Sequence, residues 1–283
     1  MGAKSGHPKG VTVPLDPTAA DLREAVLASP RAVAAHDRAA WVGLFATGAV
    51  VNDPVGSDPH TGYDAIARFY DTFIAPNDIV FDVAHDFAGP ATVLRDLTIT
   101  ITMSTGARVR VPMHLRYEVV EQDGALRIGY LAAYWELLPM AGQLMGTGPK
   151  GWRAGTRLGG LLLRNQGVRG LTGMARACTG IGAAGKRIAH RLCAAAAAGD
   201  TATVTALTGH RDAVLLWSGE SIGSAELAVR ARGLRQGKTL AAGRSVTISA
   251  DLPTGPALLM LEFHPTRDRI ETLRVHTDTV AAR

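Results

Sequence analysis

The sequence predicts an α+β protein made of two successive domains, and three features of the chain support this prediction. Its 283 residues exceed one typical domain, because domain sizes cluster near ~100–150 residues. Helical spacing of apolar residues fills the start of the first half, and strand-like alternation fills the rest. The same order of elements returns, abbreviated, in the second half. Helices that precede strands indicate a domain in which a curved antiparallel sheet wraps three helices.

Four segments follow from this pattern. Residues 1–16 contain Gly, Pro and Lys without periodicity and are expected to form a disordered leader. Residues 17–138 form the first domain, and residues 139–187 form a basic linker rich in Gly, Leu and Arg. Residues 188–283 form a shorter, degenerate copy of the first domain.

The first domain begins with helical signals. Thr18 or Asp21 can cap a helix whose residues Leu22 and Val26 are spaced for one buried face. Pro30 should break this helix or begin a new one, because proline lacks the backbone N–H that a helix interior needs.

A second helix is expected to carry Val33, Trp41 and Phe45, and a third to cover residues 63–73. Between them, residues 49–52 form a short strand that stops at Asp53-Pro54, since proline cannot donate to a β-ladder.

The remainder of the first domain alternates as strands do, at residues 79–85, 92–103, 108–121 and 126–136, with turn residues between them. In the second half, Ala198-Gly199-Asp200 is similar to Ala35-His36-Asp37, and Arg269-Ile270 is similar to Arg127-Ile128. We therefore expect a tandem duplication.

Charge is distributed unevenly along the chain. The net charge is +5, and no acidic residue lies between Glu136 and Asp200. Cations and leucines gather in that stretch, which favours a helix on an anionic membrane surface, within residues 141–187. The alternative is a basic linker packed on both domains. No base-reading module accompanies the cations, so we expect no nucleic-acid partner.

Several other classes of protein are disfavoured. No apolar run is long enough to span a bilayer, and no signal peptide opens the chain, so we expect a cytoplasmic protein, with peripheral membrane contact as the alternative. Cys178 and Cys193 lack neighbouring ligand-type residues, and His36, His60 and His85 are scattered. Neither a disulfide framework nor a metal site is expected.

A set of residues across the first half carries a family resemblance: Asn52-Asp53-Pro54-Val55-Gly56, Gly62, Ile66, Phe69-Tyr70, Arg127-Ile128 and Ala133-Tyr134-Trp135. This set resembles the delta-5-3-ketosteroid isomerases and their SnoaL-like relatives, within the nuclear transport factor 2-like superfold. The resemblance implies two cone-shaped α+β barrels, the second abbreviated, with an apolar pocket in the first. It specifies the fold better than the reaction, because this fold hosts isomerases, cyclases, epoxide hydrolases, dehydratases and scaffolds.

The resemblance also implies catalytic roles. Asp53 would be the general base, and a carboxylate at the rim of an apolar pocket suits that role because desolvation strengthens it as a base. A tyrosine donor is expected where this chain has Ser29, so Tyr70 is the candidate to replace it. Depending on strand alignment, either Glu118 or Met113 takes the position of a second acid. If the apolar face of that strand points inward, Glu118 lies on the surface.

Aromatic and apolar residues are expected to line the substrate pocket: Trp41, Phe45, Phe69, Met113, Tyr134 and Trp135. We therefore expect an isomerase that moves a proton along an enone of an apolar ring-containing substrate, a steroid or polyketide, without a cofactor. The alternative is a non-catalytic protein that binds lipids or small molecules, or a scaffold. The second copy has Leu216-Trp217 near the position of Asp53, so it would serve as a packing partner in an intramolecular pseudo-dimer or a homodimer.

Overall fold

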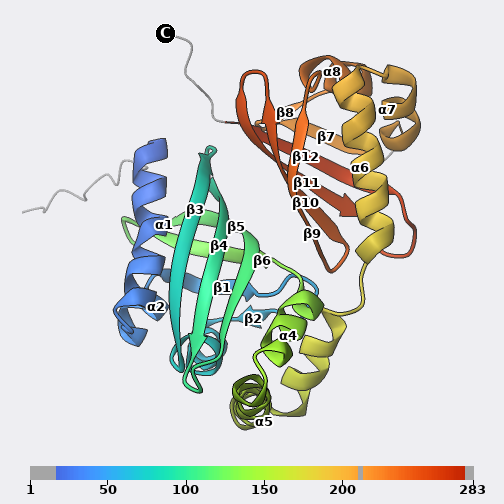
Figure 1. Ribbon diagram of the computed structural model, residues 1–283. Coiled ribbons are helices and arrows are strands. Elements are labelled where there is room, and N and C mark those ends of the chain that lie inside the picture. The colour runs from blue at the N-terminus through green and yellow to red at the C-terminus, as the bar shows by residue number, and fades with distance from the viewer. Residues whose placement is uncertain (1–16, 210–212, 278–283) are drawn as a thin grey trace, which may run out of the picture.

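The computed structural model describes residues 17–209 and 213–277, so the expected leader lies outside the described residues. The chain forms two six-stranded sheets, each covered by helices on one face (Figure 1). Both sheets are mixed, and the predicted α+β class is confirmed.

The first helix, α1 (Ala19–Ala34), begins with a reciprocal cap, in which the Thr18 side chain bonds the Asp21 backbone and the Asp21 side chain bonds Thr18. It runs through Pro30 without ending, which corrects the expected break. Leu22 and Val33 are buried on either side of the proline, and their burial in one core favours a continuous helix over the local preference.

A short helix, α2 (Arg38–Gly43), follows and is capped by the Asp37 side chain. It buries Trp41, whereas Phe45, expected in the same helix, begins the strand β1 (Phe45–Asn52). After β2 (His60–Thr61), α3 (Tyr63–Phe69) continues into a π-helical turn, η1 (Tyr70–Ile74).

The four long strands are β3 (Asn77–Ala88), β4 (Thr92–Met103), β5 (Arg108–Gln122) and β6 (Ala125–Tyr134). They form an antiparallel meander, as expected, in the sheet order β2-β1-β6-β5-β4-β3. β1 pairs with β6 in parallel, which places the C-terminal ends of these two strands at the same edge of the sheet.

Three helices connect the two sheets. α4 (Leu137–Gly146) and α5 (Pro149–Arg176) lie at one end of the first sheet, and α6 (Gly182–Ala198) begins the second half (Figure 1). The expected boundary between residues 187 and 188 falls inside α6. Within the described residues, no helix is long and apolar enough to cross a bilayer.

The second half repeats the first with shorter elements: α7 (Thr201–Thr208), β7 (Val214–Trp217), β8 (Glu220–Ser221), α8 (Ser224–Arg230), β9 (Arg235–Ala242), β10 (Ser245–Leu252), β11 (Gly255–Phe263) and β12 (Ile270–Thr277). Its sheet order, β8-β7-β12-β11-β10-β9, matches that of the first sheet. Asp200 caps α7 as Asp37 caps α2. These correspondences support the expected duplication.

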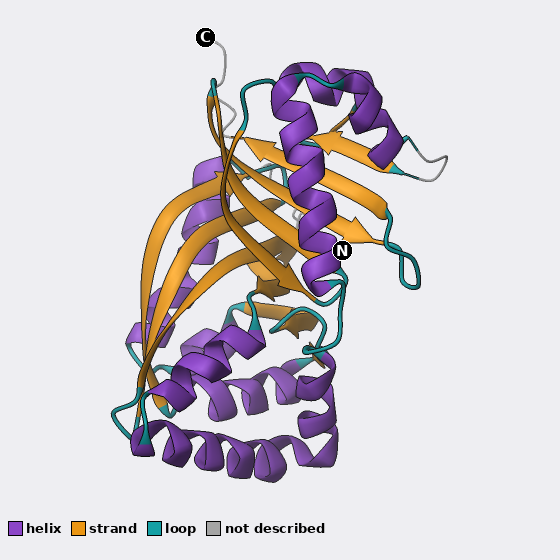
Figure 2. Ribbon diagram, turned by 45° about the vertical axis from the view of Figure 1, so that its right-hand side comes forward, coloured by secondary structure: helices purple, strands orange, loops and turns teal. Residues whose placement is uncertain are grey.

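The two halves pack sheet against sheet, with α1 and α6 on the outer sides (Figures 1 and 2). One apolar cluster joins the sheets: Phe87, Leu94, Ala132, Tyr134, Ala242, Leu258 and Met260. Polar bonds cross the same interface, because the two ring nitrogens of the buried His114 lie 2.7 Å from Thr247 Oγ1 and 2.8 Å from Ser249 Oγ.

Candidate functional site

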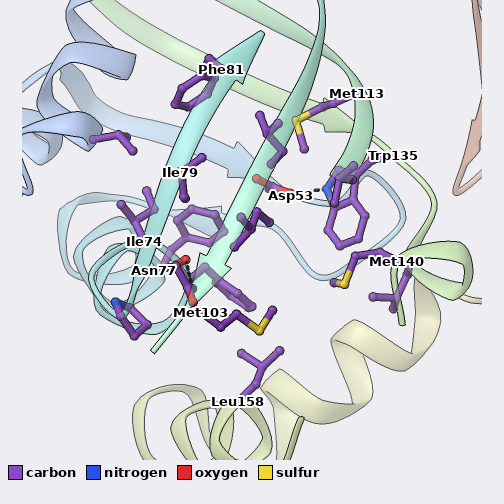
Figure 3. Close-up of a pocket in the computed structure, with 18 of the residues that line it drawn as sticks. Asp53, Ile74, Asn77, Ile79, Phe81, Met103, Met113, Trp135, Met140 and Leu158 are labelled. Carbon is purple, nitrogen blue, oxygen red and sulfur yellow. Dashed lines mark hydrogen bonds between the residues drawn. The ribbon is translucent and has the colours of Figure 1, made fainter. Parts of the chain in front are cut away.

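An apolar cavity of about 220 Å³ lies inside the first domain, between its helices and the concave face of its sheet (Figure 3). Side chains from α1, α2, β3, β4 and β5 line it, and α4 and α5 close it. It exceeds the about 150 Å³ of an engineered apolar cavity that holds benzene. The cavity is therefore large enough for an apolar ring system.

Asp53 is the acidic residue of this cavity, and the sheet topology explains its position. It follows β1 directly, and Trp135 follows β6, so the parallel pairing of these strands brings the two side chains together. Trp135 Nε1 donates to Asp53 Oδ1 over 2.6 Å. Burial raises the pKa of Asp53 to about 6, and the bond from Trp135 opposes the rise. Asp53 is thus a stronger base than an ordinary carboxylate and remains ionised at neutral pH.

Tyr117 and Ser29 place hydroxyl groups on the same cavity. Trp41 Nε1 can only donate, and it does so to Ser29 Oγ over 3.0 Å. Ser29 also bonds the Tyr117 hydroxyl. If Ser29 donates in that bond, the phenolic hydrogen of Tyr117 is free for a ligand in the cavity. Burial raises the pKa of Tyr117, whereas the nearby Arg95 and the bond with Ser29 lower it.

Tyr117 was not singled out from the sequence as a candidate donor, although a signal was available. Strand alternation places Tyr117 on the same face as Met113 and Leu115, and that face lines the cavity. The family pattern directed attention to the helix position of Ser29, whereas the hydroxyl that accompanies Ser29 comes from β5.

Four of the six residues expected to line the pocket do so: Trp41, Phe69, Met113 and Trp135. Met113 thereby occupies the inward position that one strand alignment assigned to a second acid. Phe45 instead packs edge-on against Trp41, with ring centroids 4.7 Å apart, and does not line the cavity.

Tyr70 also lies outside the cavity lining. Its ring packs 5.5 Å from that of Trp41, and its buried hydroxyl has no hydrogen-bond partner within the described structure. Because Tyr70 faces the packing between the helices, Tyr117 is better placed than Tyr70 to donate to a ligand.

Glu118 and Tyr134 face away from the cavity. Glu118 pairs with Arg116 over 2.5 Å, and Tyr134 belongs to the apolar cluster between the sheets. Both residues alternate with cavity-lining neighbours, so a position on the convex face follows from the two-residue period of a strand. Neither side chain lines the pocket, which corrects both expectations.

A second cavity, of about 570 Å³, adjoins the first, and we call it the anteroom. The two share the residues Asp53, Phe73 and Met174. The other residues of the anteroom are more polar and come from the segment after β1, from β2 and α3, and from α5: Ser57, Asp58, Pro59, His60, Thr61, Ala65, Arg68, Asn165, Gln166 and Gly173.

Helix α5 is a wall of this site. Its residues Leu158 and Leu161 line the apolar cavity. Polar bonds attach it to the first domain: Arg157 Nη1 to Ser104 Oγ over 3.1 Å, Asn165 Nδ2 to Thr72 Oγ1 over 3.1 Å and Arg176 Nη1 to Asp58 Oδ1 over 2.8 Å. A large part of the segment expected to be a linker therefore completes the first domain.

Among residues 17–209 and 213–277, no group of three or more His, Cys, Asp or Glu side chains could hold a metal ion. His60, which lines the anteroom, packs on the ring of Phe69 with centroids 5.1 Å apart.

The family model of the SnoaL-like domain matches residues 26–128. No match was found among curated proteins. Among solved structures, a delta 5-3-ketosteroid isomerase from Mycobacterium sp. is 30% identical, over 41% of this chain and 92% of that chain, with a TM-score of 0.37.

A Mycobacterium tuberculosis protein in complex with estradiol-17β-hemisuccinate is 28% identical, over 42% of this chain and 96% of that chain, with a TM-score of 0.38. An M. tuberculosis LEH-like epoxide hydrolase is 20% identical, over 45% of this chain and 91% of that chain, with a TM-score of 0.39. Because these TM-scores are below 0.5, the assignment rests on the family model and on the fold described above. The first half of this chain is therefore a SnoaL-like domain.

Proposed function

We propose that the protein is an isomerase that moves a proton along the enone of an apolar, ring-containing substrate such as a steroid or a polyketide. The observation that carries this proposal is the environment of Asp53. Its carboxylate has a pKa raised to about 6, adjoins an apolar cavity and is oriented by the indole of Trp135. A base with these properties suits removal of a weakly acidic proton from carbon.

The proposed reaction needs only groups of this chain. Asp53 takes a proton from the carbon between the carbonyl and the double bond, and the electron pair moves to the carbonyl oxygen. Tyr117 donates a hydrogen bond to the resulting dienolate oxygen. Asp53 then returns the proton to the far carbon of the dienolate, which leaves a conjugated enone. The Trp135 bond occupies Oδ1, so Oδ2 is the oxygen that carries the proton.

The test is the absorbance of the conjugated enone formed from a β,γ-unsaturated 3-ketosteroid. We expect the wild type to convert the steroid and Asp53→Asn to be inert. Loss of one oxyanion donor costs about 10²–10³ in rate, so Tyr117→Phe should slow the reaction to that extent. Tyr63→Phe, an exposed residue outside the cavity, is the control and should keep full activity.

Equal activity of wild type and Asp53→Asn would refute the proposed base. If the wild type is inert but binds the steroid in the cavity, the protein is a carrier of apolar ligands instead of an isomerase.

Contact with a membrane surface is the second candidate, because α4 and α5 carry several exposed apolar side chains: Leu138, Trp152, Leu163 and Val168. Exposed cations lie on the same helix, among them Lys150, Arg153 and Arg164. This mixture suits an anionic lipid surface. Co-flotation with anionic but not neutral liposomes is expected, and Trp152→Ser should weaken it. Tyr63→Ser, which removes an exposed aromatic residue from α3, should not.

A further inference from the structure

We propose that the anteroom binds an anionic, oxygen-rich substituent of the substrate, with Arg68 as the group that recognises it. The ring system of the same substrate would occupy the apolar cavity, and in that respect the inference rests on the proposed function. The ligand class is thus an amphipathic ring ketone that carries a carboxylate or phosphate arm.

The continuity of the two cavities is the first argument. Asp53, Phe73 and Met174 contribute to both, so a ligand can extend from one into the other beside the Asp53 carboxylate. The apolar cavity alone holds about 220 Å³, whereas the anteroom adds about 570 Å³ that a purely apolar ligand would leave to water.

The charges of the anteroom are the second argument. Asp58 is neutralised by Arg176, with Arg176 Nη1 at 2.8 Å from Asp58 Oδ1. Arg68 is exposed and forms no ion pair with an acidic side chain of the described residues. Burial lowers the pKa of His60, and the nearby Arg68 lowers it further, so this imidazole is neutral at physiological pH. An incoming anion would meet the unpaired Arg68 guanidinium, while the ionised Asp53 carboxylate, which also lines the anteroom, would repel it.

The amide groups of α5 are the third argument. Asn165 Nδ2 and Gln166 Nε2 both donate to Thr72 Oγ1, over 3.1 and 3.5 Å, which holds these side chains at the wall of the anteroom. Each amide keeps a second N–H that can donate to a ligand oxygen. Guanidinium and amide donors on one wall are suited to carboxylate and phosphate oxygens.

The position of Asp53 restricts the ligand further. Because the two cavities meet at Asp53, the anionic arm must branch from the ring close to the carbon that loses its proton. A carboxylate or phosphate arm near the reacting carbonyl meets this requirement, whereas an anion at the far end of a long ring system does not.

Isothermal titration of the full chain at pH 8 tests the inference with three probes: 2-naphthol, 3-hydroxy-2-naphthoate and 2-naphthyl phosphate. The first two differ only in a carboxylate beside the hydroxyl. A charge-assisted hydrogen bond strengthens binding by roughly tenfold, so the carboxylate probe should bind about tenfold more tightly than the neutral one. A still tighter phosphate probe would identify a phosphate arm, and a weaker one a carboxylate arm.

Arg68→Gln should abolish the preference for the anionic probes and leave the affinity for 2-naphthol unchanged. Arg153→Gln removes an exposed cation from α5 that lines neither cavity, and it should preserve the preference. The inference is overturned if the wild type binds the neutral and anionic probes equally, or if Arg68→Gln weakens all three alike.

The preference is measured by binding, so it does not depend on catalysis. Asp53→Asn should retain the preference for anions, or increase it, because a negative charge beside the anteroom is removed. An inactive wild type that prefers the anionic probes would refute the isomerase and leave the binding site standing. An active enzyme without this preference would refute the anion-binding site and leave the isomerase standing.

Discussion

Asp53 places a buried carboxylate on the wall of the apolar cavity. Its carboxylate contributes to both the apolar cavity and the anteroom, and Trp135 is the side chain that donates to it. Burial raises its pKa to about 6, while Trp135 limits the rise. The Asp53 carboxylate is therefore ionised at neutral pH and is a stronger base than an exposed aspartate.

Removal of the Trp135 bond should shift the pH dependence of catalysis. In the proposed reaction Asp53 acts in its ionised form, so kcat/KM should increase with pH through about 6 in the wild type. In Trp135→Phe the stabilising bond is lost, the pKa rises further, and the increase should occur at higher pH. Steady-state rates between pH 4.5 and 9 measure this shift. The control Trp152→Phe changes an exposed tryptophan outside the cavity and should keep the wild-type profile.

A profile of Trp135→Phe that is unchanged, or that moves to lower pH, would contradict the role assigned to the indole. The comparison uses the position of the profile and not its height, so a general loss of activity does not affect it.

At the scale of elements, α5 determines whether the cavity is closed. The helix packs on α4 at its start and changes direction at Gly167, where φ is 67°. Only a residue with access to positive φ adopts this conformation readily, and glycine does so without a side-chain clash. Beyond that point Gly173 and Met174 contribute to the wall of the anteroom.

The contact between α4 and α5 depends on Gly151. A Cβ atom at this position would lie 1.8 Å from the Leu144 carbonyl oxygen, so Gly151→Ala should separate the helices and destabilise the protein by about 1–3 kcal/mol. Gly160 lies on the same helix with nothing within 4 Å of an added Cβ. Gly160→Ala should therefore stabilise the protein by about 0.4–1 kcal/mol. Urea denaturation measures the free energy of unfolding of both variants. If the two substitutions change it equally, the close packing at Gly151 is contradicted.

At the scale of the whole molecule, the two sheets share one interface. Gly56 of the first half and Gly243 of the second approach so closely that a Cβ on Gly56 would lie 2.6 Å from Gly243 Cα. We propose that the second half stands in for the second subunit of an isomerase-like dimer. Solution scattering should then show one compact particle, and two independently tumbling lobes would count against the proposal.

An ion pair between the buried Asp96 and the half-buried Lys238 joins the two halves at this interface. Lys238 of β9 pairs with Asp96 of β4, and its Nζ donates to the carbonyl oxygens of Leu97 and Met113 over 2.7 and 3.0 Å. Burial alone would raise the pKa of Asp96, but bonds from His114, Lys238 and other donors outweigh it and hold the pKa below its usual range.

Loss of one partner of a buried pair costs about 3–5 kcal/mol, so Lys238→Met should lower the free energy of unfolding by roughly that amount. Arg235 lies on the same strand in an exposed pair with Asp251, and Arg235→Met should cost less than about 1 kcal/mol. Both values come from urea denaturation. A similar small effect for the two variants would show that the buried pair does not hold the halves together.

His276 should make the stability of the molecule sensitive to acid. Burial, together with the nearby Arg116 of β5 and Arg274 of β12, lowers its pKa to about 4, while Glu262 of β11 pairs with Arg274. The unfolded histidine takes up a proton near pH ~6.5. Between that pH and about 4 the unfolded state binds more protons, so the free energy of unfolding should decrease as the pH falls through this window.

In the variant His276→Leu, the free energy of unfolding should depend less on pH between 6.5 and 4 than it does in the wild type. Urea denaturation at several pH values measures both. An unchanged slope would mean that other groups account for the sensitivity to acid.

Local patterns were sufficient to predict much of the fold. The strand expected at residues 92–103 coincides with β4, and Thr18 caps the first helix as its chemistry suggests. The same local rules were wrong at Pro30, because burial on both sides of the proline outweighs its intrinsic preference. The position of Asp53 after a short strand was also predicted from the sequence.

By itself, the sequence determined the α+β class, the order of the elements, the resemblance to SnoaL-like proteins and the prominence of Asp53. Only the tertiary structure decided that Tyr117, and not Tyr70, lies on the cavity beside Ser29, that Glu118 and Tyr134 lie outside its lining, and that α5 closes the cavity. The physical reason is the separation along the chain over which each kind of interaction acts. Periodicity and capping act between residues a few positions apart, whereas the partners of a site are chosen by strand register and helix docking across the whole chain.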